Sequence, residues 1–338
     1  MSLGRKATLN TGYQIPLLGY GTWQAAPGEV GTGVFEALKA GYRHLDLAHM
    51  DGTARNPSTD MYSSYRNQRE VGEGLKKAFK EIPGLKREDI FIPEHVERSL
   101  DISLDELGLD YLDLFLIHWP VAFEYRSDTE LFPLDLTSTN PKKDIKIDDY
   151  VSLADTWKAM TNLPKSKVRS VGVSNHTVSH IEALIKATGV VPAVNQVERH
   201  PLLQSTELVN YCKEKGILIT AYSAFGNNMI GEPLLLTRPE IQTIADRLSA
   251  TPAQVLLAWS QVGGHSVIPK SVTPARIVEN FMEIELSEED IASINALGKV
   301  PRRYNTPYAC YSPRWDINIF GEESEKGATH EVVLRSKL

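Results

Sequence analysis

The sequence predicts a (β/α)8 barrel, a closed ring of eight parallel strands in which a helix follows each strand. Eight short runs rich in Val, Ile and Leu alternate with amphipathic patterns along the 338 residues. These runs are mostly apolar, as expected for strands buried on both faces of a parallel sheet. No change in composition divides the chain. We therefore expect a single domain over residues 1–338, with the barrel at about 15–298 and a tail at 299–338.

The expected strands follow one another along most of the chain. They are LLGYG (17–21), HLDLA (44–48), DIFI (89–92), YLDLFLIH (111–118), VRSVGVS (168–174), AVNQVE (193–198), LITAYSA (218–224) and HSVIPKS (265–271). Apolar residues at helical spacing predict helices between them. The clearest two stripes are Val71, Leu75, Phe79 and Ile82, and Val96, Leu100, Leu104 and Leu107. Thr251-Pro252 and Thr273-Pro274 have the pattern of an N-cap followed by Pro in the first turn, which predicts two further helix starts.

The alternative to a closed barrel is an open, doubly wound sheet. That fold often carries G-x-G-x-x-G after its first strand, and the motif is absent there. Three segments interrupt the alternation: 53–65, 121–149 and the aromatic, Pro-rich stretch after Lys299. Because the loops after the strands form the catalytic face of a barrel, we expect the first two segments to lie there.

Composition and charge limit the classes of partner. The net charge of −7 does not suggest a nucleic-acid surface, and no apolar run is long enough to span a membrane, so we expect neither as a partner. The two cysteines, Cys212 and Cys310, cannot form a disulfide framework and fit a reducing compartment. The last three residues, Ser336, Lys337 and Leu338, match a peroxisomal address read by an import receptor. We therefore expect a peroxisomal protein, with the cytoplasm as the alternative.

Polar residues at the ends of the expected strands are candidates for chemistry. Asp46 is at the end of the second strand and His118 ends the fourth, both on the rim where barrel enzymes work. Taken singly, an Asp after a strand is more often a cap or an ion-pair partner, and a His in an apolar strand is more often a core residue. After the eighth strand, Lys270 and Arg276 lie around an expected helix start, which suits a phosphate. A capped helix with solvated charges explains that segment equally well.

Seven longer motifs occur on these strands and loops in a consistent order. They are GYRHLDLA (41–48), YRNQREVGEG (65–74), LGLDYLDLFLIHWP (107–120), VGVSN (171–175), NQVERHP (195–201), AYSAFG (221–226) and IPKSVTPARIVEN (268–280). Through these motifs the chain resembles the aldo-keto reductases over nearly its whole length, and among them the fungal aldehyde or glycerol reductases. The resemblance implies NADPH-dependent reduction of aldehydes and ketones, or oxidation of polyols such as glycerol in reverse, by a monomer.

The resemblance also assigns roles to single residues on the catalytic side of the site. The residues that match the catalytic tetrad are Asp46, Tyr65 and His118. Tyr65 is preferred to Tyr62 because it directly precedes the segment that begins RNQREVGEG. The residues that match the substrate pocket are Trp23 and Trp119.

Further matches concern the cofactor NADP(H). Those for the nicotinamide carboxamide are Ser174, Asn175 and Gln196, and the match for the aromatic residue stacked on its ring is Tyr222. Those for the pyrophosphate loop are Ser223, Phe225, Gly226 and Asn227. Those for the ribose 2′-phosphate are Lys270, Ser271, Thr273 and Arg276, and those for adenine are Glu279 and Asn280.

The sequence departs from the family pattern at two neighbouring places. Eighteen residues separate Asp46 from Tyr65 where the family has four, so about 14 extra residues lie in a loop. After the third strand the family continues with a Ser-Lys-Leu-Trp-like segment and a short loop, whereas this chain passes directly from Ile92 to Pro93. The catalytic lysine is therefore absent. Three lysines on the preceding helix, Lys76, Lys77 and Lys80, are expected only to form a solvated face.

The second departure has physical consequences. A tyrosine with an ordinary pKa near 10 exchanges protons poorly at neutral pH, and a neighbouring lysine would lower that pKa. Without the lysine, we expect Asp46 to remain an unpaired carboxylate and aldehyde reduction to be weak. We also expect the first turn of the helix that begins near Pro93 to unwind, or the third strand to shift, because barrel closure needs that strand. Intron sequence retained at 51–64 and exon sequence lost after Ile92 would explain both departures.

Two hypotheses from different classes remain. The first is an enzyme that reduces small carbonyl compounds with NADPH. The second is a catalytically impaired barrel that binds the nucleotide as a sensor or as a partner protein. A barrel hydrolase would need a carboxylate pair or a metal cluster at the rim, and the sequence shows neither.

Overall fold

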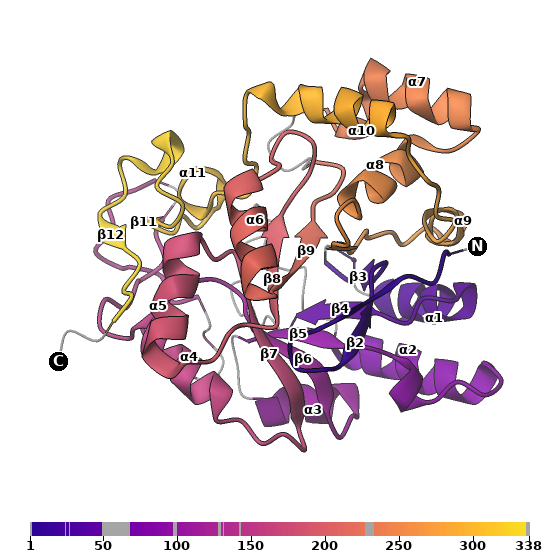
Figure 1. Ribbon diagram of the computed structural model, residues 1–338. Coiled ribbons are helices and arrows are strands. Elements are labelled where there is room, and N and C mark those ends of the chain that lie inside the picture. The colour runs from indigo at the N-terminus through magenta and orange to yellow at the C-terminus, as the bar shows by residue number, and fades with distance from the viewer. Residues whose placement is uncertain are drawn as a thin grey trace.

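The computed structural model describes residues 2–23, 25–26, 28–48, 68–96, 100–127, 130, 132–141, 143–226 and 233–335. Eight strands form one sheet, and they are β3 (Tyr20–Gly21), β4 (Leu45–Ala48), β5 (Pro93–Val96), β6 (Leu112–Ile117), β7 (Val168–Ser174), β8 (Val194–Glu198), β9 (Leu218–Tyr222) and β10 (Ser266–Val267). Each strand pairs in parallel with the next one along the chain. Helices surround this sheet (Figure 1).

The sheet closes on itself between its first and last strands. The Gly19 N–H donates to the Val267 carbonyl at 2.9 Å, and the Val267 N–H donates to the Leu17 carbonyl at 2.8 Å. The Gly21 N–H adds a third bond to the Pro269 carbonyl at 2.9 Å. The predicted (β/α)8 barrel is therefore confirmed.

The helices follow the strands as the apolar stripes predict. They are α1 (Val30–Ala40), α2 (Gln68–Glu81), α3 (Leu100–Leu107), α4 (Leu153–Thr161), α5 (Val178–Thr188), α6 (Thr206–Lys215), α7 (Pro239–Leu248), α8 (Pro252–Ser260), α9 (Pro274–Asn280), α10 (Glu288–Asn295) and α11 (Pro307–Cys310). Short 3-10 turns are η2 (Arg87–Asp89), η3 (Leu235–Thr237), η4 (Ala296–Lys299) and η5 (Glu323–Glu325). Two small pairs lie outside the barrel, the antiparallel β1 (Lys6–Thr8) and β2 (Gln14–Pro16) and the parallel β11 (Ile317–Asn318) and β12 (His330–Glu331).

The two predicted Thr-Pro helix starts differ in their capping. The Thr251 hydroxyl accepts a hydrogen bond from the Gln254 N–H at 3.2 Å, so α8 has the expected side-chain cap. Thr273 stands at the N-cap position of α9, but its hydroxyl makes no capping bond. Instead, the Ser271 hydroxyl accepts the Thr273 N–H at 3.1 Å. The position of the second helix start was predicted correctly, and the capping group was not.

Strand β5 is built from residues that the sequence assigned to a helix. Pro93–Val96 pairs with β4, where Ala48 faces His95, and with β6, where Leu116 faces the same residue. Phe91 precedes it and bridges to His44, so the strand region begins where it was predicted. Helix α3 then begins only at Leu100. The expected unwinding of the first helical turn is confirmed, and Val96 was wrongly placed in the helical stripe. The ring needs a strand between β4 and β6, and these are the residues next in the chain.

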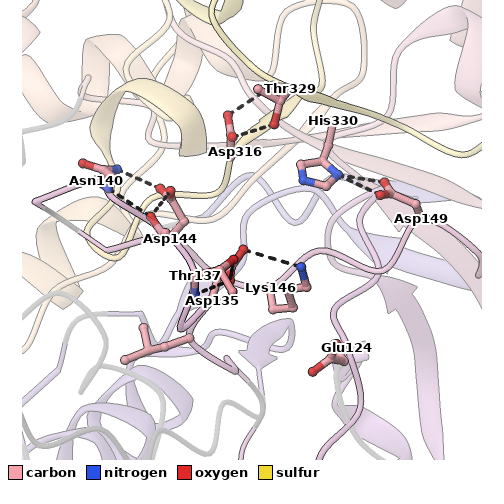
Figure 2. Close-up of polar contacts among 12 residues, drawn as sticks. Glu124, Asp135, Thr137, Asn140, Asp144, Lys146, Asp149, Asp316, Thr329 and His330 are labelled. Carbon is pink, nitrogen blue, oxygen red and sulfur yellow. Dashed lines mark hydrogen bonds and ion pairs between the residues drawn. The ribbon is translucent and has the colours of Figure 1, made fainter.

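The segment 121–149 and the C-terminal tail pack together beside the barrel. Their apolar side chains form one cluster, whose buried members are Trp119, Ile145, Ile147, Trp315, Ile317 and Ile319. The Arg314 guanidinium pairs with the Asp144 carboxylate through bonds of 2.7 and 3.1 Å. Figure 2 shows a second link, in which His330 Nδ1 lies 2.8 Å from an oxygen of Asp149. The long loop and the tail therefore form one layer.

Candidate active site

Polar side chains gather where the barrel strands reach their carboxyl ends. Asp46 lies in β4, Ser174 is the last residue of β7, Gln196 lies in β8 and Tyr222 ends β9. His118 directly follows β6. In a parallel barrel these ends meet at one rim, and this rim is where barrel enzymes bind their substrates.

The amide of Gln196 connects two opposite sides of the barrel. Its Nε2 donates to Asp46 Oδ1 at 2.8 Å, and both side chains are buried. Strands β4 and β8 are separated by three strands on either side of the ring. Asp46 is therefore not the unpaired carboxylate that the loss of the lysine led us to expect, because an amide donor reaches it across the barrel interior.

Asn175, which follows β7, connects the residue after β6 with the last residue of β9. Its Nδ2 donates to the His118 carbonyl at 2.9 Å, and its Oδ1 accepts from the Tyr222 hydroxyl at 2.7 Å. Ser174 supports the same region by donating its hydroxyl to the Gln196 carbonyl at 2.8 Å. The structure thus brings together all the described residues expected at the nicotinamide, along with two of the expected catalytic residues.

Burial fixes the protonation of the tyrosine in this network. Desolvation raises the pKa of Tyr222 well above its ordinary value, and the nearby Glu198 carboxylate raises it further. The phenol therefore stays protonated and acts as a hydrogen-bond donor to Asn175. Asn175 directly follows β7, and Ser223 directly follows β9. Their φ angles are 64° and 51°, in the left-handed region that costs a non-glycine residue free energy. Two such residues at one rim indicate a backbone shaped for a task other than stability.

The loop after β9 is tied to the tail. The Ser223 hydroxyl accepts a bond from Asn305 Nδ2 at 3.4 Å, and the Phe225 carbonyl accepts the Leu235 N–H at 2.9 Å. Phe225 is half-buried between two apolar clusters. Asn227 lies outside the described residues, as does the expected catalytic residue Tyr65, so the positions predicted for both stay predictions.

The expected phosphate site follows β10. Lys270 is half-buried, which lowers the pKa of its ammonium group, and the Glu29 carboxylate acts in the opposite direction. The Tyr20 hydroxyl, which lies against α1 at Gly33, donates to the Ser271 carbonyl at 2.6 Å and so fixes the turn from the helix side of the barrel wall. Arg276 lies exposed on α9 and carries its charge to the surface. This segment therefore offers two cations beside a hydroxyl turn, a donor set that fits a phosphate.

The remaining expected contacts are on the same helix. Glu279 is exposed, and its carbonyl accepts Gln254 Nε2 at 3.0 Å. Asn280 is the buried last residue of α9. Thr273 is exposed at the start of the helix. The three residues lie within one short helix and its cap, as the sequence predicted, and nothing further in the structure tests an adenine contact.

The two predicted pocket tryptophans have different surroundings. Trp119 packs against three aromatic rings of the tail, at centroid distances of 6.0 Å to Tyr311, 5.5 Å to Trp315 and 6.3 Å to Phe320. Trp23 is half-buried after β3. The sequence analysis did not single out these three tail aromatics as neighbours of Trp119. The sequence showed that the tail is rich in aromatic residues. It did not show that these residues pack against Trp119.

The donor set of the rim fits a nicotinamide dinucleotide. Amide and hydroxyl groups from three strands match the donors and acceptors of a carboxamide, while the cations after β10 suit a phosphate. Within the described ranges, no group of three or more His, Cys, Asp or Glu is arranged to hold a metal ion. In the same ranges, no helix is both long and apolar enough to cross a membrane.

A parallel barrel whose rim carries this polar network belongs to the class of barrel enzymes. The family model of the aldo/keto reductases matches residues 17–299, and this chain belongs to that family. The resemblance inferred from the motifs is thus confirmed, and the chain is an oxidoreductase.

Individual relatives cover nearly the full length of the chain. A D/L-glyceraldehyde reductase of Hypocrea jecorina is 59% identical, over 99% of this chain and 100% of its own. A glycerol 2-dehydrogenase (NADP(+)) of Saccharomyces cerevisiae is 37% identical, over 90% of this chain and 95% of its own. The solved structure of the aldose reductase from Schistosoma japonicum has a TM-score of 0.78 and 36% identity, over 94% of this chain and 99% of its own.

The glyceraldehyde reductase also bears on the two departures from the family pattern. Its alignment spans 351 positions, which is more than the 338 residues of this chain. At least 13 aligned positions therefore have no residue in this chain. Residues are missing relative to that enzyme, and the shortened passage expected after Ile92 stays a prediction of the sequence.

Proposed function

We propose that this chain is an NADP(H)-dependent reductase of small aldehydes, glyceraldehyde among them, and that it oxidises small polyols in the reverse direction. The observation that carries the proposal is the rim network that joins β4, β7, β8 and β9 through Gln196, Asn175 and Tyr222. The relatives named above support the substrate class, because one is a D/L-glyceraldehyde reductase and another is a glycerol 2-dehydrogenase (NADP(+)).

Reduced nicotinamide supplies a hydride to the carbonyl carbon of the substrate. The side chains of this protein orient the reactants and provide for the proton that the carbonyl oxygen must gain. Ser174, Asn175 and Gln196 offer the amide and hydroxyl groups that would hold the carboxamide. Trp119 and the tail aromatics shield the reacting centre from water, since they form a buried cluster beside His118.

Preference for NADPH over NADH follows from the segment after β10. Lys270 and Arg276 place positive charge at the turn and the helix that would meet a ribose 2′-phosphate. Charge-assisted bonds to phosphate are strong, and only NADPH carries this group. The proposal therefore predicts tighter binding of NADPH than of NADH.

Turnover by this sequence is proposed to be slow. The strand between β4 and β6 consists of Pro, Glu, His and Val, so no lysine stands in it to lower the pKa of a catalytic tyrosine. The Asp46 carboxylate accepts a hydrogen bond from the neutral amide of Gln196, and neither group can supply the positive charge of a lysine. The nucleotide-binding sensor is the less favoured function, because the relatives named above are all reductases or a dehydrogenase.

The experiment that tests the proposal separates binding from turnover. The purified chain is titrated with NADPH and with NADH while the quenching of tryptophan fluorescence is followed, and NADPH consumption is then measured with D- and L-glyceraldehyde. We expect saturable binding of NADPH, weaker binding of NADH, and slow consumption that depends on the aldehyde. Failure to bind either nucleotide would overturn the proposal. Binding without any detectable turnover would favour the sensor.

Monomeric state and peroxisomal location stay predictions of the sequence. Ser336, Lys337 and Leu338 lie outside the described residues.

A further inference from the structure

A buried glutamate connects the barrel to the tail at the edge of the rim. Glu198 is the last residue of β8 and pairs in register with Tyr222 of β9. Its side chain is fully buried. A buried carboxylate is costly unless its oxygens are bonded, so the partners of this group indicate what it holds in place.

The carboxylate of Glu198 binds backbone far away in the sequence. Oε1 accepts the Tyr304 N–H at 2.8 Å, and Oε2 accepts the Asn305 N–H at 2.8 Å. His200 Nε2 completes the set at 2.9 Å from Oε1. Burial would raise the pKa of this carboxyl, but the bond from His200, the charge of Arg303 and the bond from Asn305 hold the pKa below its ordinary value. Glu198 is therefore an ionised clamp on residues 304–305.

The two clamped residues contact both ends of the loop after β9. Asn305 Nδ2 donates to the Ser223 hydroxyl at 3.4 Å. The Tyr304 ring lies against Gly226, where a Cβ would come within 3.4 Å of Tyr304 Cε2, and it belongs to the cluster against which Phe225 packs. The span 223–226 is thus supported from the tail side by the two residues whose backbone Glu198 binds.

We propose that Glu198 is a positioning residue for cofactor binding, which acts through Tyr304 and Asn305 to hold the loop 223–226 in its binding conformation. This inference rests on the proposed function and on the family resemblance, which assigns that loop to the pyrophosphate of NADPH. Ser223 has a φ of 51° and Gly226 a φ of 79°. Because such a φ costs a serine free energy, whereas a glycine adopts it freely, the loop needs external support at Ser223. Glu198 supplies that support without touching the cofactor.

A second buried glutamate in the same tail provides a matched control. Glu325 is 1% exposed and likewise accepts backbone N–H bonds, from Ile319 at 3.1 Å, Phe320 at 2.8 Å and Glu322 at 3.3 Å. These three partners lie within six residues of Glu325 and outside the loop 223–226. Glu198→Gln and Glu325→Gln therefore remove the same charge from equally buried sites, but only the first change affects the support of the loop.

The test measures the Kd for NADPH by fluorescence and the Tm by circular dichroism for the parent and both variants. Removal of a charged hydrogen-bond partner typically changes an equilibrium constant by a factor of about ten to a hundred. We therefore expect the Kd for NADPH to rise by this factor in Glu198→Gln. Glu325→Gln should leave the Kd within about threefold of the parent at a comparable loss of Tm. Asn305→Ala removes the side-chain bond to Ser223 but keeps the backbone N–H that Glu198 binds, so it should also raise the Kd, by a smaller factor than Glu198→Gln.

Each outcome decides the proposal. A Glu198→Gln variant that loses Tm like the control but keeps the parental Kd would show that Glu198 is only structural. If Glu198→Gln does not fold, an unchanged Kd in Asn305→Ala would overturn the proposal and a raised Kd would support it. A parent chain that does not bind NADPH would overturn the proposed function, and this inference with it.

Discussion

The two halves of the barrel reach the same architecture in different ways. In the second half, β7, β8 and β9 are five to seven residues long and β10 has two, and residues of the longer strands form the hydrogen-bonded rim network. In the first half, β3, β4 and β5 have two to four residues and β6 has six, and β5 is made from residues expected in a helix. Figure 1 shows both halves contributing to one continuous sheet.

The difference separates what the fold requires from what the chemistry requires. Pro93 has no N–H to donate but stands at the first position of its strand, where proline is tolerated, so Pro93–Val96 can fill the place between β4 and β6. Catalysis depends on a particular side chain at a particular rim position, and a displaced segment does not supply it. The residues expected at the nicotinamide thus lie in the second half, whereas the catalytic lysine that the sequence analysis expects to be missing belongs to the first half. Four predictions test this contrast.

Restoring the missing segment should have the largest effect. Insertion of Ser-Lys-Leu-Trp with a short loop between Ile92 and Pro93, together with removal of 51–64, should raise kcat/KM for glyceraldehyde by about 10²–10⁴. The reason is that the lysine lowers the pKa of the catalytic tyrosine. The control is the same insertion with methionine in place of lysine, which should restore the loop but not the rate. Equal rates for the original and the repaired chain would show that the first half is not impaired.

Cofactor selectivity should depend on the second half alone. Arg276→Ala should weaken NADPH binding by about tenfold or more and leave NADH binding nearly unchanged, because only NADPH carries the 2′-phosphate. Fluorescence titration with both nucleotides measures the two constants in one preparation, so NADH is the internal control. Equal losses for both would mean that Arg276 is structural.

Glycine substitutions compare the packing of the two halves. At Gly172 in β7, a Cβ would lie 2.8 Å from the Val194 carbonyl oxygen and 2.7 Å from Leu116 Cδ2, whereas at Gly21 in β3 the nearest atom, the Ile268 carbonyl oxygen, is 3.1 Å away. Overpacking costs about 1–3 kcal/mol. Gly172→Ala should therefore reach the upper end of this range in the free energy of unfolding by urea, and Gly21→Ala the lower end. The opposite order would show that Gly21 is the more tightly packed of these two positions.

Low pH should reduce the free energy of unfolding mainly through buried histidines of the second half. Burial lowers the pKa of His176 to about 3 and those of His180 and His265 to about 4, and it also lowers the pKa of His44 in the first half. In the unfolded chain a histidine takes up a proton near pH 6.5, before the folded chain does, so stability falls as pH drops below 6.5.

A single variant checks the sign of this effect. His176→Gln should flatten the plot of unfolding free energy against pH between about 6.5 and 5, where carboxylates stay ionised, by up to about 1.4 kcal/mol per pH unit. Urea unfolding at several pH values gives the slope directly. An unchanged slope would mean that His176 is already protonated in the folded protein or does not titrate on unfolding.

The sequence by itself determined the barrel and most of the rim. Eight apolar runs separated by amphipathic stripes predict parallel strands and helices, because burial on both faces leaves a local apolar pattern. The ends of those runs then place Ser174, Gln196 and Tyr222 on one rim, since parallel strands share a direction. Even the loss of helical structure at Pro93–Val96 was expected, because a closed ring needs every one of its strands.

Only the tertiary structure decided which groups bond to one another. Gln196 donates to Asp46 although 150 positions separate them, and Glu198 binds the backbone of Tyr304 and Asn305 more than a hundred residues away. The packing of Tyr311 and Trp315 against Trp119 is of the same kind. The local pattern of apolar and polar residues predicts which side chains are buried. The hydrogen-bond or packing partner of a side chain depends on how the whole chain folds. For this reason the strands could be predicted from the sequence, and the bond to Asp46 and the clamp at Glu198 could not.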